Sequence, residues 1–249
     1  MARFLSAILV ALFVAGPAMA RADEAEAKAK AVVDKAIKAA GGEEKLAKVG
    51  AYTWKNKASV NFNGNESEFD GKVTVQGLDH YRNEFGNDQF QGVIVLSGDK
   101  GWRKFGENAS DIDGEGIARE KRTVYLSATP VLLVPLKGKG FKLASAADEK
   151  VGDKAAAVVK VTGPDGKEFT LYFDKETGLP VKLVAKVTGF NNGDEFTMET
   201  TYADYKDFDG IKKATKIESK RDGEAFMKAT ISEFKVLDKV DAGTFAEPK

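Results

Sequence analysis

The sequence predicts a mainly β fold with a few helices, in which about eleven antiparallel strands form a large curved sheet or an open, incomplete barrel. Two observations predict this class. Apolar and polar residues alternate over most of the chain from Tyr52 onward, which is the pattern of antiparallel strands with one buried and one solvated face. Short clusters of Gly, Asn and Asp separate these stretches, as turns do in a meandering sheet. No stretch has the composition of an inter-domain linker, so we expect residues 21–249 to form one domain.

Residues 1–20 predict a cleaved signal peptide. Arg3 gives a short positive start, residues 4–15 are apolar, and residues 18–20 carry the small side chains of a cleavage site. The apolar run is short for a membrane-spanning helix, although an uncleaved anchor is the alternative. The chain has no cysteine, so none stands at the cleavage site to carry a lipid. We therefore expect the mature chain to be free in the periplasm or secreted.

The first structural element of the mature chain is expected to be a helix over residues 23–40. Apolar residues recur there at three- and four-residue spacing, with Lys and Glu between them. Gly41 and Gly42 end the pattern, and a short helical piece over residues 43–49 leads into the first strand. Alternation then predicts strands over residues 52–62, 69–76, 81–85, 89–97, 101–105, 155–162, 168–173, 180–187, 195–205, 213–221 and 224–237.

The middle of the chain, residues 113–140, is expected to form a helical lid or plug. Asp113 is suited to cap a helix that runs to about Ser127. The acidic residues 111–115 do not form a calcium loop, because the twelfth position is Arg122 where a Glu is required. Pro130 interrupts the helix, and residues 131–136 are the most apolar stretch of the mature chain. Lys137, Lys139 and Lys142 follow, either as partners for anionic headgroups or as a solvated loop.

Composition excludes several classes of function. The chain has 38 basic and 38 acidic residues, and without residues 1–20 it has 37 and 38, which argues against nucleic acid as a partner. With His80 as the only histidine and no cysteine, neither a Ser-His-Asp or Cys-His site nor most zinc sites can be assembled. We predict no catalytic residue, no metal and no cofactor. A hydrolase that uses paired carboxylates stays open, but no acid pair lies among apolar residues that would shift a pKa.

The positive signal is an excess of large apolar side chains on one face of the sheet. Each taken singly fits a packed core, but eight strands already enclose a barrel filled by its own side chains, and about eleven leave an opening for a plug or an apolar ligand. The side chains expected to converge on the concave side are those of Trp54, Phe62, Phe69, Tyr81, Phe85, Trp102, Phe169, Phe173, Phe196 and Tyr202.

Four segments resemble one family of exported proteins. They are residues 39–49 (AAGGEEKLAKV), which lead into the strand with Trp54, residues 97–102 (SGDKGW), residues 171–181 (LYFDKETGLPV) and residues 205–212 (YKDFDGIK). Together they are similar to the outer-membrane lipoprotein-sorting proteins, which are LolA/LolB-like relatives of the periplasmic lipoprotein carrier and its outer-membrane receptor. The resemblance covers nearly the whole mature chain.

The resemblance implies an unclosed barrel of about eleven strands with helices over an apolar cavity that takes acyl chains. Because the chain has no cysteine to lipidate, it resembles the soluble carrier rather than the receptor. Arg82 is the nearest candidate for the strand arginine that closes the carrier's lid. The residues expected to bind lipid are Trp54, Phe62, Phe69, Val73, Trp102, Leu132, Leu133, Leu136, Phe169, Leu171 and Phe173.

The implied function is non-catalytic transport by a monomer. Its partners would be the acyl chains of lipoproteins or lipids, an inner-membrane exporter and an outer-membrane acceptor. The alternative on the same fold is a lipid-sensing or protein-interaction module of the cell envelope.

Overall fold

The structure is a computed structural model that describes residues 17–62, 64–189 and 193–249, without the side chains of residues 17–20 and Phe62. Most of the expected signal peptide, residues 1–16, therefore lies outside the described residues. The helices are α1 (Pro17–Ala40), α2 (Glu43–Ala47), α3 (Gly114–Leu132) and the 3₁₀ helix η1 (Val134–Lys137).

The strands follow the expected pattern with two additions. Their bounds are β1 (Ala51–Phe62), β2 (Asn65–Gln76), β3 (His80–Gly86), β4 (Gln91–Ser97), β5 (Lys100–Phe105), β6 (Asn108–Asp111), β7 (Lys142–Val151), β8 (Lys154–Thr162), β9 (Glu168–Asp174), β10 (Pro180–Thr188), β11 (Glu195–Phe208), β12 (Ile211–Arg221) and β13 (Glu224–Leu237).

In the described residues the strands form one antiparallel sheet of thirteen strands, which is not closed into a barrel. Its order is β6-β5-β4-β3-β2-β1-β13-β12-β11-β10-β9-β8-β7, so two meanders are joined where β1 pairs with β13. The two edges of the sheet are β6 and β7, which are consecutive along the chain. The connection between them, α3 followed by η1, therefore has to pass from one edge of the open sheet to the other.

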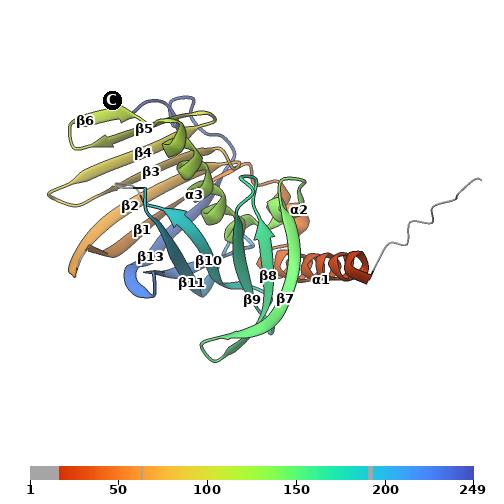
Figure 1. Ribbon diagram of the computed structural model, residues 1–249. Helices are drawn as coiled ribbons and strands as arrows, with labels where there is room; N and C mark the ends of the chain where they lie inside the picture. Colours follow the sequence, from red (N-terminus) through yellow and green to blue (C-terminus); the bar gives the residue numbers. More distant parts are fainter. Residues whose placement is uncertain (1–16, 63, 190–192) are drawn as a thin grey trace, which may run out of the picture.

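Figure 1 shows the result: α3 lies between the arm of β3, β4 and β5 and the arm of β8, β9 and β10. We call the face of the sheet that meets the helices the inner face. Helix α1 covers the β7 and β8 end of it, with Ala29, Val33, Ala36 and Ile37 buried. This is the apolar face that the spacing predicts for residues 23–40, so the amphipathic pattern determines how the helix docks.

The expectation that the helix ends near Ser127 is wrong. Helix α3 continues through Pro130 to Leu132, and it ends where Leu133 adopts a φ of 61°. Proline removes one backbone donor, but in the last turn of a helix this leaves one carbonyl unpaired rather than breaking a long ladder. The backbone N–H of Leu133 still donates to the carbonyl of Thr129 (3.0 Å). At the other end, Asp113 caps the helix as expected and accepts from the N–H of Gly116 (2.7 Å).

Candidate functional site

The register of the sheet decides which predicted residues share the inner face. Trp54 lies opposite Val73 on β2 and opposite Phe234 on β13. On the other arm, Phe169 pairs with Val161, and Leu171 pairs with Val159. Directly opposed residues in an antiparallel pair place their side chains on the same face. Trp54, Val73, Phe169, Leu171 and Phe173 are all buried in one apolar cluster with residues of α1 and α3.

The apolar stretch at the end of α3 lies against this cluster. Leu132, Leu133 and Leu136 are buried, and Leu133 has no exposed surface. They belong to the same cluster as Trp54 and Phe169. The helix end thus occupies the space between the two arms of the sheet with its own side chains, which is the position of a plug.

Trp102 and Arg82 are on the other face of the sheet, contrary to expectation. Trp102 pairs with Val95, which pairs with Arg82, and that row continues to Thr74. Thr74 is next to Val73 on β2, and successive strand residues point to opposite faces. Trp102 therefore does not converge with Trp54, because the turn at residues 97–100 fixes a register that turns it outward.

The outer face is also where Arg82 finds its partners. Its guanidinium forms an ion pair with Glu84 (2.8 Å) and donates to the carbonyl of Thr244 in the C-terminal segment (3.4 Å). Lys104 donates to the carbonyl of Lys249 (2.7 Å), so the chain end lies along β3 and β5. Figure 1 shows the C-terminus at this place. Arg82 therefore holds the C-terminal segment and does not contact α3.

The arginine that connects α3 to the sheet is Arg122, which lies on the helix itself. It is 5 % exposed. Its Nε donates to the carbonyl of Lys186 on β10 (2.9 Å), and its Nη2 donates to the carbonyl of Glu168 on β9 (3.0 Å). Its Nη1 pairs with Asp165 in the β8–β9 turn (2.9 Å) and also contacts the Tyr125 hydroxyl. Sequence reasoning missed this residue because it considered strand arginines only, although an arginine inside the proposed lid was the available signal.

The carboxylate of Asp165 is held in its charged form. Burial by itself raises its pKa, but hydrogen bonds from the Lys167 backbone N–H and from Tyr125 and Arg122 outweigh burial, and the pKa is lowered. Burial raises the pKa of Tyr125, which therefore stays a neutral donor. The contact is a charge-assisted network rather than an isolated surface pair.

Helix α3 is held on its opposite side too. Lys121 forms an ion pair with Asp99 in the β4–β5 turn. Glu120, 4 % exposed, pairs with Arg119 (3.3 Å), and burial raises the pKa of its carboxyl. At the far end of the segment, Lys137 pairs with Asp34 of α1 (3.1 Å) and Glu43 of α2 (2.9 Å).

Lys137 therefore ties η1 to two helices. Its hydrogen bonds to Glu43 and Asp34 raise its pKa, so it stays charged. The proposed role for an anionic headgroup is left to Lys139 and Lys142, which are exposed.

A second aromatic cluster lies on the inner face toward the hairpin ends of β2 to β5. It consists of Phe69, Phe85, Phe90 and Phe105, whose neighbouring ring centroids lie 5.9 to 6.4 Å apart. The Phe85 ring lies over Gly92, where a Cβ would come within 2.6 Å of it. Three of the rings are partly exposed and Phe90 is 39 % exposed, so this half of the inner face is not covered by the helices. Phe62, also expected to bind lipid, ends β1 near this place, but its side chain lies outside the described residues.

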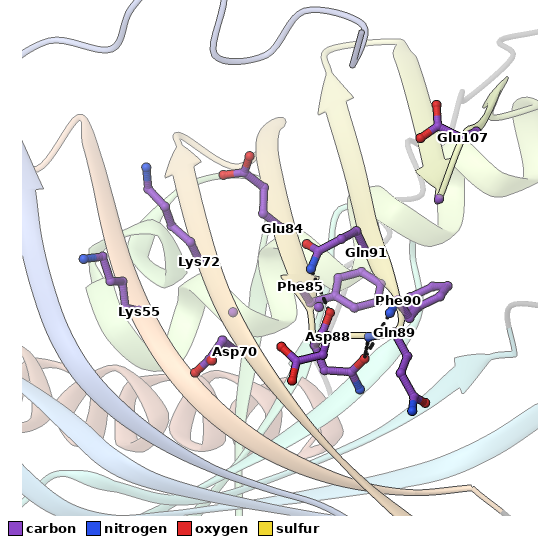
Figure 2. A pocket seen from close by; sticks show the side chains of 14 residues that line it. Lys55, Asp70, Lys72, Glu84, Phe85, Asp88, Gln89, Phe90, Gln91 and Glu107 are labelled. Carbon is purple, nitrogen blue, oxygen red and sulfur yellow. Dashed lines mark hydrogen bonds between the residues drawn. The ribbon is translucent and has the colours of Figure 1, made fainter.

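A groove of about 750 Å³ lies at the same end of the molecule (Figure 2). Its wall combines Phe85 and Phe90 with the charged residues Lys55, Lys72 and Glu84. The register places these three charged residues in one row with Lys104 on the outer face. Among the residues expected to bind lipid whose side chains the structure describes, none lines this groove. The groove has a mixed apolar and charged lining and is open to solvent, and it shares no lining residue with the leucines between the arms.

The described residues contain no group of three or more His, Cys, Asp or Glu side chains placed to hold a metal ion. No helix within the described ranges is long and apolar enough to cross a membrane.

Comparison with protein-family models gives no match, and comparison with curated proteins gives none either. Comparison with solved structures does find similar folds. A LolA superfamily protein from Nitrosomonas europaea has a TM-score of 0.58 at 13 % identity, covering 87 % of this chain and 96 % of that one. A DUF1329 family protein from Desulfovibrio piger has a TM-score of 0.57 at 12 % identity, with coverage of 87 % and 96 %.

A domain assigned to outer-membrane lipoprotein-sorting proteins, from Vibrio parahaemolyticus, has a TM-score of 0.54 at 10 % identity. It covers 86 % of this chain and 97 % of that one. The fold class expected from the sequence is thus confirmed: the chain has the open, antiparallel fold that it shares with a LolA superfamily protein.

Proposed function

We propose that this chain is a soluble periplasmic carrier that binds acyl chains of lipids or lipoproteins on the inner face of its sheet and delivers them towards the outer membrane. The observation that carries the proposal is the placement of α3 and η1. They bridge the two edges of an open sheet, and they put Leu132, Leu133 and Leu136 into the apolar space between its arms. The fold shared with a LolA superfamily protein supports the same function.

Transport requires release as well as binding. Burial of one methylene group is worth about 0.8 kcal/mol, so a sixteen-carbon chain gains roughly 12 kcal/mol. Unopposed, that affinity makes release very slow. A plug that fills the empty space has to be displaced first, which lowers the net affinity by the free energy of its own packing. The three leucines supply such a competitor.

In this function the ion pairs of α3 set how readily the plug leaves. Lys121 and Arg122 hold the helix to opposite arms of the sheet. When the helix moves outward, the acyl chain contacts the residues it uncovers, which include Trp54, Val73 and Phe169. The aromatic cluster of Phe69 and Phe85 extends this apolar surface toward the uncovered half of the inner face.

The proposal is tested with protein purified from the periplasm. Mass spectrometry of the native protein is expected to find bound acyl chains, and delipidated protein is expected to take up a neutral fluorescent probe such as 1-N-phenylnaphthylamine. Native protein without lipid, together with delipidated protein that takes up no probe, would overturn the proposal.

Exchange distinguishes a carrier from a sensor. A carrier passes labelled lipid from donor to acceptor vesicles without a covalent change to the lipid. Each protein molecule is expected to transfer many lipid molecules. Capture of one stable membrane partner with no exchange would overturn transport and favour the sensing module. We expect the carrier to be monomeric, which sedimentation measures directly.

A further inference from the structure

Lys213 is a buried cation on the inner face of the sheet. It lies on β12 between Ile211 and Thr215, and all three alternate residues are buried. Lys213 is 4 % exposed. Its Nζ lies 5.5 Å from the centre of the Trp54 ring, and Trp54 belongs to the inner apolar cluster. The ammonium group therefore lies inside the space that the proposed function assigns to the ligand.

No counterion among the described residues accompanies this charge. None of the ion pairs formed within the described part of the chain includes Lys213, and burial is the only cause that shifts its pKa, lowering it to about 8. At neutral pH the group is still mostly protonated. A buried charge without a partner is costly, and proteins rarely keep one without a use for it. The cation–π contact with Trp54 compensates only part of the lost hydration.

A second buried donor is the hydroxyl of Tyr52, an aromatic neighbour of Trp54. The Tyr52 ring stacks on Trp54 with centroids 5.8 Å apart, and Tyr52 is 1 % exposed. Its hydroxyl has no hydrogen-bond partner among the described residues. Burial raises its pKa, so the hydroxyl stays neutral and keeps its proton. The electrostatic neighbour of this hydroxyl is Tyr81 on β3 and not Lys213 on β12, so Tyr52 serves as a control for Lys213 and not as a second donor to the same group.

We propose that Lys213 binds the carboxylate of a fatty acid, which enters the inner face with its charged end first and lies against Trp54. This inference rests on the proposed function and narrows its ligand. The ammonium of Lys213 matches the single charge of a carboxylate and can donate to its oxygens. An ester-linked acyl chain has no charge at its inner end and leaves Lys213 uncompensated. The tail of the fatty acid then lies along the apolar residues that the plug covers.

The test compares dodecanoate with 1-dodecanol at pH 7, each displacing 1-N-phenylnaphthylamine from delipidated protein. The two probes have the same tail and differ in charge. Wild-type protein is expected to bind dodecanoate about tenfold more tightly than 1-dodecanol, which is the usual range for a charge-assisted hydrogen bond. Lys213→Met is expected to abolish the preference while binding of 1-dodecanol is retained. Tyr52→Phe removes a buried hydroxyl but leaves Lys213 in place, and it is expected to keep the preference.

Two variants control the measurement. Lys212→Met removes a charge from an exposed neighbour on the same strand and is expected to keep the full preference. Lys213→Arg retains a cation and is expected to keep part of it. Equal affinity of wild-type protein for the two probes, or an unchanged preference in Lys213→Met, would overturn this inference and leave the carrier function standing. Failure of both probes to bind would overturn both.

Discussion

Lys121 and Arg122 are neighbours on α3, yet they form ion pairs with opposite arms of the open sheet. Lys121 pairs with Asp99 in the β4–β5 turn, and Arg122 pairs with Asp165 in the β8–β9 turn (2.9 Å). Successive helix residues point about 100° apart, so a helix that lies between two arms can reach both from adjacent positions. The two contacts differ in surroundings, because Asp99 is almost fully exposed and Arg122 is buried.

This difference predicts unequal effects of removing the two cations. Arg122→Met removes the ion-pair partner of Asp165 and the side-chain donor to the carbonyls of Glu168 and Lys186, and we expect it to lower the free energy of unfolding by about 2–4 kcal/mol. Lys121→Met breaks a solvated pair and is expected to cost about 0.5 kcal/mol or less. Urea unfolding measures both. Amide hydrogen exchange in residues 114–132 is expected to be faster in Arg122→Met than in wild type. Equal losses of stability in the two variants would show that Arg122 does not hold α3 to the sheet more strongly than Lys121 does.

The plug makes a prediction about affinity. Leu136→Ala removes a buried side chain, and we expect it to lower the free energy of unfolding by about 2–5 kcal/mol. Because a weaker plug competes less, affinity for 1-dodecanol is expected to rise in the same variant. Val236→Ala, at a position that is 41 % exposed, serves as the control and should change stability by less than about 0.5 kcal/mol. If probe affinity in Leu136→Ala falls or stays the same, the leucines do not act as a competitor of the ligand.

Lys213 makes stability depend on pH in a definite direction. Burial lowers its pKa from 10.5 to about 8, so between these values the unfolded chain binds more protons than the folded one. Stability contributed by this group therefore rises with pH across that window, and the penalty for burying the charge, about 3 kcal/mol, is fully present below pH 8. We expect ligand-free Lys213→Met to be more stable than wild type at pH 7, and the difference to shrink by pH 10.

Urea unfolding of both proteins at the two pH values measures this difference, in which the titration of the other lysines cancels. A difference that is the same at pH 7 and pH 10 would show that Lys213 is not desolvated in the folded protein.

The tight packing of the aromatic cluster can be tested by a substitution at Gly92. A Cβ on Gly92 would come within 2.6 Å of the Phe85 ring, which is packed against Phe90 and Phe105. Gly92→Ala is therefore expected to lower the free energy of unfolding by about 1–3 kcal/mol, since the ring cannot move without disturbing its neighbours. Gly50→Ala is the matched control, because nothing lies within 4 Å of its Cβ position. Thermal unfolding that shifts equally in the two variants would argue against tight packing of this cluster.

Local pattern was enough to place most of the inner face. Trp54, Val73, Phe169 and Leu171 alternate with polar neighbours, and strand geometry puts alternate residues on one side whatever the rest of the chain does. The helix cap at Asp113 and the helix over residues 23–40 could be predicted for the same reason, since capping and amphipathicity are properties of a few consecutive residues.

Two strands, β6 and β7, could not be predicted from the local sequence. Residues 142–151 are rich in Ala, Asp, Glu and Lys, which have low strand propensity, and they form β7 because β8 and α1 pack against them. β6 has four exposed residues and exists only through its pairing with β5. In both cases tertiary partners override a weak local preference.

The sequence by itself therefore determined the composition of the apolar face, the open antiparallel class and the helix that Asp113 caps. Only the tertiary structure decided that Trp102 and Arg82 face outward, that Arg122 holds α3 to the sheet, and that Lys213 is buried beside Trp54. Each of these depends on register or on contacts between residues far apart in the chain. A shift of one residue in register moves a side chain to the other face, and no local pattern records which partner a distant arginine or lysine will meet.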